Sequence, residues 1–108
     1  MHSSDPQPLA HLTVVPTEAC HLCEQAERTL TDLREDFPFT VESLALDSVD
    51  GRRLVAQHRP AMAPLVLVDG QFFSAGRLSR RRLAALLQAR SLRAHDDVWT
   101  EQAGALHG

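Results

Sequence analysis

Two cysteines are the residues of this 108-residue chain whose type and spacing point most clearly to chemistry. Cys20 and Cys23 are separated by two residues, at a point where an apolar strand-like run gives way to a helical pattern. Three helical steps bring the two Cα atoms to about 5 Å, within the range of about 4.4–6.8 Å that a disulfide accepts. The pair can therefore close as a disulfide with little backbone movement and serve as one redox couple.

The expected positions of the two thiols on the helix assign them different catalytic roles. Cys20 is predicted at the helix N-terminus, where unpaired backbone N–H groups and the helix dipole favour the thiolate. It is therefore the expected nucleophile. Cys23 lies one turn further, on the same apolar stripe as Ala26 and Leu30. Its burial favours the thiol and suits it to resolve a mixed disulfide.

Two interpretations remain open for the residue that follows Cys20. A protonated His21 would stabilise the thiolate and make the disulfide more oxidising. Alternatively, His21 is an exposed loop residue with no electronic role. Leu22 is expected to be an apolar residue at the surface that faces the substrate.

Two alternative interpretations of the cysteine pair involve no redox turnover. A CxxC pair can be half of a zinc site, but such a site needs four ligands, and the chain contains neither a second CxxC nor a well-spaced histidine pair. A site shared across a dimer would supply the missing ligands. The second alternative is two incidental structural cysteines.

The remaining pattern predicts an α/β domain with the element order βαβαββα. Strands are expected at 9–15, 39–46, 65–68 and 71–74, and Asp69-Gly70 is a strong hairpin signal between the last two. Helices are expected from Cys20 to Pro38, from Asp47-Ser48 to Pro60, and from Ser79. The result is a mixed four-stranded sheet with helices on both faces, over residues 9–90. Residues 1–8 are predicted to be a flexible lead and 91–108 a C-terminal tail, helical in part.

Composition excludes several classes of protein. Eleven basic against fourteen acidic residues give a formal net charge of −3, which argues against a dedicated nucleic-acid binder. The purest apolar run, Leu65 to Val68, is far shorter than the roughly 20 residues that span a bilayer. The polar first residues resemble no targeting leader. The expectation is a cytoplasmic monomer without membrane or nucleic-acid partners.

Taken together, these features resemble the thioredoxin-fold superfamily, and most closely its small glutaredoxin-like branch. The resemblance runs from about His11 to Ala89. It rests on the strand before Cys20-His21-Leu22-Cys23, the Ala63-Pro64 step before the third strand, the Asp69-Gly70 hairpin, and Gly76-Arg77-Leu78-Ser79 leading into the last helix. It implies a dithiol-disulfide oxidoreductase that reduces protein or low-molecular-weight disulfides in cell redox homeostasis.

The resemblance also implies a substrate-binding surface around the sulfurs. It places a cis peptide bond between Ala63 and Pro64, facing the cysteines, and assigns the Ala63 backbone to pairing with a bound thiol peptide. An ordinary trans proline that begins a strand is the alternative, and Pro60 is the competing cis candidate. His21, Leu22 and Gly76 complete the expected substrate contacts.

No bound cofactor or metal is expected, and a low-molecular-weight thiol such as glutathione enters as a co-substrate. Its identity stays open, because Thr17 stands where many glutaredoxins have a lysine. The expected partners are disulfide-containing proteins or small thiols, together with a reductase or thiol donor. The alternative function is a thioredoxin-fold binding, adaptor or redox-sensing module with little turnover. Its basis is the loss of familiar glutathione contacts and the tail at 91–108, which contains Trp99.

Overall fold

The computed structural model describes the backbone of residues 7–107 and the side-chain surroundings of residues 7–94. Of the predicted flexible lead, residues 1–6 lie outside the described part. The elements in chain order are β1 (His11–Val15), α1 (His21–Arg34), β2 (Thr40–Ser43), α2 (Val49–His58), β3 (Leu65–Val68), β4 (Gln71–Ala75) and α3 (Arg80–His107). This is the predicted βαβαββα order, with β2 shorter than the predicted 39–46 segment.

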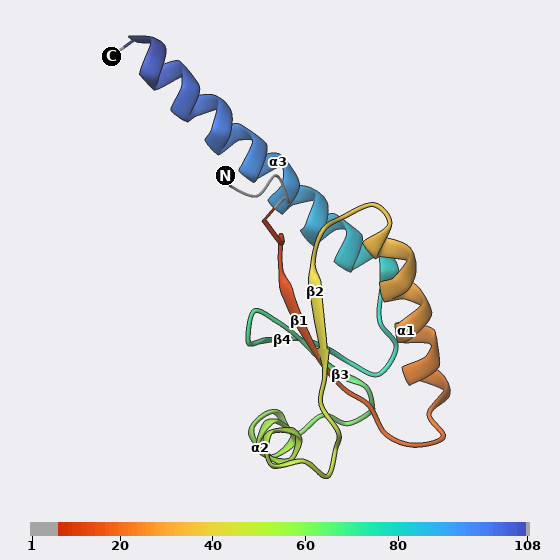
Figure 1. Cartoon of the computed structure of the whole chain (residues 1–108). Coiled ribbons are helices and arrows are strands. Elements are labelled where there is room, and N and C mark those ends of the chain that lie inside the picture. Colours follow the sequence, from red (N-terminus) through yellow and green to blue (C-terminus); the bar gives the residue numbers. More distant parts are fainter. Residues whose placement is uncertain (1–6, 108) are drawn as a thin grey trace, which may run out of the picture.

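The strands form one mixed sheet with the order β2-β1-β3-β4 (Figure 1). β1 runs parallel to β2 and antiparallel to β3, and β3 runs antiparallel to β4. Helix α1 provides the crossover between the parallel strands, whereas a two-residue turn joins β3 to β4. The predicted mixed four-stranded sheet is therefore confirmed.

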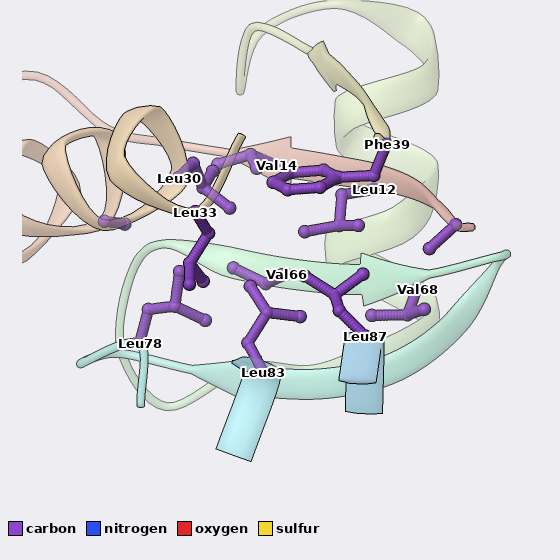
Figure 2. Packing of buried hydrophobic residues seen from close by; sticks show 12 residues of the cluster. Leu12, Val14, Leu30, Leu33, Phe39, Val66, Val68, Leu78, Leu83 and Leu87 are labelled. Atoms are coloured by element: carbon purple, nitrogen blue, oxygen red, sulfur yellow. The ribbon is translucent and has the colours of Figure 1, made fainter. Parts of the chain in front are cut away.

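Helices α1 and α3 cover one face of this sheet, and a cluster of buried side chains fills the space between them (Figure 2). The strands contribute alternate residues, since successive side chains in a strand point to opposite faces. These are Leu12 and Val14 of β1 and Val66 and Val68 of β3. The helices and their connections contribute mainly leucines: Leu30, Leu33, Leu78, Leu83 and Leu87, together with Ala26 and Phe39.

The intervening residues of the same strands face α2 on the other side. Val15, Leu65 and Leu67 pack there against Leu54 of α2, and all four are buried. Both central strands are thus covered on both faces, which explains why Leu65–Val68 is continuously apolar. The prediction of helices on both faces is confirmed.

Serine side chains cap the N-termini of two helices, as the sequence predicts. Ser48 Oγ accepts a hydrogen bond of 2.9 Å from the backbone N–H of Gly51 at the start of α2. Ser79 Oγ accepts one of 3.1 Å from the N–H of Arg82 at the start of α3. Each contact satisfies a backbone donor that has no partner within the helix.

The β3–β4 turn is closed by Asp69 and Gly70, which have φ angles of +51° and +82°. Positive φ at both residues is the requirement of the tight turn that the Asp-Gly pair predicts. Asp69 also ties the turn to β1 and α3, because its carboxylate accepts from the His11 N–H at 2.9 Å and pairs with Arg90. Partial burial acts to raise the pKa of Asp69, but these contacts outweigh it and hold that pKa below its ordinary value.

Helix α3 is longer than the sequence pattern indicates. Residues 91–108 are predicted to be a tail that is helical in part, whereas the helix continues to His107 and its second half extends away from the sheet (Figure 1). Residues 91–103 contain neither proline nor glycine, so nothing in the chain interrupts the helix. A helix that leaves the core needs no apolar stripe, which is why the segment lacks helical periodicity. The side chain of Trp99 lies outside the described part.

Candidate active site

Cys20 and Cys23 are joined by a disulfide at the start of α1. Their Cα atoms are 5.1 Å apart, in agreement with the spacing expected from one helical turn. Cys20 is the N-cap residue, and its sulfur accepts a hydrogen bond of 3.1 Å from the backbone N–H of Cys23. The helix therefore directs one of its unpaired N–H groups at the Cys20 sulfur, where negative charge develops when the disulfide is reduced.

The two cysteine residues differ in exposure in the direction that their predicted roles require. Cys20 is half-buried, whereas Cys23 is buried, with 6% of its surface exposed. His21 is exposed and Leu22 is half-buried. Among the described residues, His21 makes no hydrogen bond or ion pair that would tie it to the sulfurs. The structure thus separates the cysteines into an accessible and a sheltered member, and leaves the electronic role of His21 a prediction.

A cis peptide bond between Ala63 and Pro64 faces the cysteine pair. The carbonyl oxygen of Ala63 lies 3.8 Å from the Cys20 sulfur, although the two residues are 43 positions apart in the sequence. Pro64 is buried and immediately precedes β3. The cis Ala63-Pro64 bond implied by the family resemblance is therefore confirmed, rather than a cis bond at Pro60.

Gly76 connects this loop to the end of β4. Its backbone N–H donates a hydrogen bond of 3.0 Å to the Pro64 carbonyl, and its φ angle is +98°. A Cβ atom at Gly76 would lie 3.2 Å from the Cβ of Met62. A glycine is needed here both for the backbone conformation and for the close approach of the Met62 side chain.

Two residues near the site were missed by the sequence analysis. Met62 is 56% exposed and lies over Gly76, so it adds an apolar side chain beside the Ala63-Pro64 bond. Gln25 joins α1 to the segment before α3, because its side-chain amide donates to the Leu78 carbonyl at 3.1 Å and accepts from the Leu78 N–H at 3.3 Å. No local feature of the sequence could have predicted the contact between Gln25 and Leu78. An apolar methionine within a loop, such as Met62, is a weak indication of a binding surface.

A cavity of about 320 Å³ opens beside the disulfide, between α1, β2 and the loop after β1. Cys20 and Cys23 line it together with apolar residues such as Val14 and Leu30. Glu24 and Glu27 of α1 line it as well. Within the described residues, no three His, Cys, Asp or Glu side chains are grouped so as to hold a metal ion.

Comparison with known proteins agrees with this architecture. The chain matches no protein-family model and no curated protein. Among solved structures it is similar to a mutant thioredoxin from Halobacterium salinarum NRC-1, with a TM-score of 0.55 and 17% sequence identity. The alignment covers 77% of this chain and 75% of the thioredoxin. The protein therefore has a thioredoxin-like fold, with its Cys-X-X-Cys pair at the start of α1.

The helices also bear on membrane insertion. Within residues 7–107, no helix has the combination of length and apolar character that crossing a membrane requires.

Proposed function

We propose that the protein is a dithiol-disulfide oxidoreductase, with Cys20 as the nucleophile and Cys23 as the resolving thiol. One observation carries the proposal. The half-buried Cys20 at the N-terminus of α1 is bonded to a buried Cys23 one turn away, and both are faced by the cis Ala63-Pro64 loop. A purely structural cross-link between adjacent turns of one helix would constrain little of the chain, since it closes a loop of only a few residues.

The chemistry requires no group beyond the two thiols and the substrate. The Cys20 thiolate attacks one sulfur of a substrate disulfide, forming a mixed disulfide while the other substrate sulfur leaves as a thiolate and takes a proton from water. Cys23, deprotonated by solvent, then attacks the Cys20 sulfur. The second substrate sulfur leaves, and the Cys20–Cys23 disulfide forms. Two electrons have passed to the substrate.

The surface around the sulfurs supports binding of an extended peptide. The backbone of Ala63 lies beside Cys20 and can pair with a substrate strand, as a sheet edge does. We assign Leu22 to the apolar surface under such a strand, and the buried Pro64 and Gly76 to the loops that support this surface. His21 is assigned to its exposed rim.

Within this class we infer a glutaredoxin-like role in cell redox homeostasis, with cytoplasmic protein or small-molecule disulfides as substrates. The support is the sequence resemblance, including the Asp69-Gly70 hairpin and the Gly76-Arg77-Leu78-Ser79 segment. The oxidised protein must receive two electrons from a dithiol reductase or from a low-molecular-weight thiol such as glutathione. The rate at which each donor reduces the oxidised protein, measured for one donor at a time, distinguishes the two. Faster reduction by glutathione supports the glutaredoxin-like role, and faster reduction by a dithiol reductase supports a thioredoxin-like one.

Serine variants of the two cysteines test the proposal. Cys20→Ser is expected to abolish disulfide reduction, and Cys23→Ser to accumulate a mixed disulfide visible as added mass, because the resolving thiol is missing. Ala89→Ser, which adds a hydroxyl at an exposed position of α3, serves as the matched control and keeps full activity. Full activity of Cys20→Ser would overturn the mechanism.

A binding or redox-sensing module is a second candidate, because α3 continues beyond the sheet to His107 and offers a helix for a partner. The alkylation rate of the reduced protein by iodoacetamide, measured against pH, separates the two functions. An oxidoreductase is expected to reach half its maximal rate well below pH 8.5. A module without turnover is expected to titrate near 8.5, as an unperturbed thiol does.

A further inference from the structure

Arginine side chains gather beside the cysteine site, between α1 and the beginning of α3. Arg28 of α1, Arg77 of the segment before α3, and Arg80 and Arg81 of the first turn of α3 line one open cavity of about 530 Å³. Gln25 and Leu78, which join the two segments by paired hydrogen bonds, also line it. We call this cluster of four arginines the arginine pocket.

A short series of contacts and neighbouring residues connects the cysteine site to the arginine pocket. The Cys20 sulfur lies 3.8 Å from the Ala63 carbonyl, and the adjoining Pro64 carbonyl accepts from Gly76. Arg77 follows Gly76 directly. On the other side of the pocket, Gln25 follows Cys23 by two residues in α1. A chain bound across Ala63 and Gly76 would therefore lead into the pocket.

Three of the four guanidinium groups in the pocket have no ion-pair partner among residues 7–94. Arg80 pairs with Asp32 at 2.8 Å. Within residues 7–94, no carboxylate lies within ion-pair distance of Arg28, Arg77 or Arg81, and all three side chains are exposed. The first turn of α3 has no acidic residue, although acidic residues are the favoured ones there. This local excess of cations stands out in a chain whose formal net charge is −3.

The distance from Cys20 to the pocket sets the size of the ligand. Arg28 follows Cys20 by 28 − 20 = 8 residues, which corresponds to about 12 Å along the axis of α1. An extended peptide advances about 3.3 Å per residue and covers this distance in three to four residues. Arginine guanidinium groups bind carboxylates through paired, charge-assisted hydrogen bonds.

We propose that Arg28, Arg77 and Arg81 bind acidic side chains of a protein substrate, three to four residues from the cysteine that Cys20 attacks. The inference rests on the proposed function for its substrate, and it makes the protein selective for disulfides in acidic segments. Arg80 belongs to the pocket but is held by Asp32. The pocket thus supplies sequence preference, while the loop at Ala63 supplies backbone pairing.

A binding experiment tests the docking without turnover. The Cys20→Ser/Cys23→Ser protein is titrated with two fluorescent ten-residue peptides that carry a central serine, one with glutamates three and four residues from it and one with glutamines there. The acidic peptide is expected to bind at least about fivefold more tightly at low salt, and the difference is expected to shrink as salt is added.

Substitution of Arg28, Arg77 and Arg81 by glutamine in the same protein is expected to remove this difference. Arg52→Gln, which removes an exposed arginine of α2 on the other face of the sheet, is the matched control and keeps it. An unchanged acidic preference in the triple variant, or a preference insensitive to salt, would overturn the proposal.

Turnover separates this proposal from the proposed function. With disulfide versions of the two peptides, the ratio of kcat/KM for acidic over neutral substrate is expected to be at least about fivefold and to fall to about one in the triple variant. Oxidised glutathione, a small anionic disulfide, is the third substrate. If its kcat/KM falls in the triple variant as much as that of the acidic peptide, the assignment of the pocket to a peptide would be overturned. Binding selectivity without turnover of either peptide would contradict the oxidoreductase function alone and leave the docking surface in place.

Discussion

Gly76 holds the connection between β4 and the arginine pocket in a conformation that other residues adopt only at a cost. Its φ angle of +98° and the close approach of Met62 both oppose a side chain there. Gly76→Ala is expected to lower the free energy of unfolding by about 1–3 kcal/mol, as measured by urea denaturation. The same substitution should weaken peptide binding, because a backbone shift that relieves the strain would move the Gly76 N–H away from the Pro64 carbonyl.

The double variant Met62→Gly/Gly76→Ala, compared with Met62→Gly alone, separates the two causes, because only glycine removes the Met62 Cβ that would lie 3.2 Å from a Cβ at Gly76. Removal of the Met62 side chain relieves the contact but not the backbone strain, so part of the loss is expected to remain. Equal stability of the double variant and Met62→Gly, or no loss in Gly76→Ala, would contradict the conformational requirement.

Individual site residues differ in how far the sequence predicts them. The separation and the different exposure of Cys20 and Cys23 follow from local spacing, because one helical turn determines both. Ala63-Pro64 required the family resemblance, since no local pattern places that loop beside Cys20. Gln25 was missed because its pairing with Leu78 depends on how α1 approaches a segment 53 residues later.

At the level of elements, Asp69 links the β3–β4 hairpin to β1 and α3, and this link depends on pH. Because the folded-state pKa of Asp69 lies below its ordinary value, its contribution to stability is present above about pH 4 and is lost as the pH falls through the folded-state value. Asp69→Asn retains a residue that tolerates positive φ but removes the charge. The variant is expected to be less stable by about 0.5–1 kcal/mol at pH 7.

The difference in stability between wild type and Asp69→Asn is expected to shrink as the pH falls below the ordinary pKa of an aspartate and the wild-type carboxylate takes up its proton. Urea unfolding of both proteins at a series of pH values measures this difference. A difference that does not change with pH over the acid range would show that the charge of Asp69 is not the cause.

The elements that face the core were predicted because burial imposes a pattern on them. Leu65–Val68 is continuously apolar because both faces of the strand are covered, and this run predicts a strand. In α1 the apolar residues recur at helical spacing because one side of the helix packs on the sheet. The second half of α3 could not be predicted in this way. Its backbone extends away from the sheet (Figure 1), and its sequence shows no sustained apolar period over residues 91–107.

For the whole molecule, the fold should not depend on the far end of α3. The buried residues of α3 in the described part are Leu83 and Leu87, both in its first turns. Removal of residues 95–108 is expected to change the free energy of unfolding by less than about 0.5 kcal/mol while reducing the helical circular-dichroism signal. Leu87→Ala, expected to cost about 2–5 kcal/mol, is the contrasting variant. A similar loss on truncation would show that the far end packs on the domain.

The reduction potential of the Cys20–Cys23 disulfide tests the central claim of reversible dithiol chemistry most directly. It is measured by equilibrating the whole protein with defined thiol buffers and quantifying the free thiols by alkylation and mass. The account predicts a reversible two-electron couple between about −200 and −270 mV, the range spanned by glutaredoxins and thioredoxin. A potential below about −300 mV, as structural disulfides have, would contradict it.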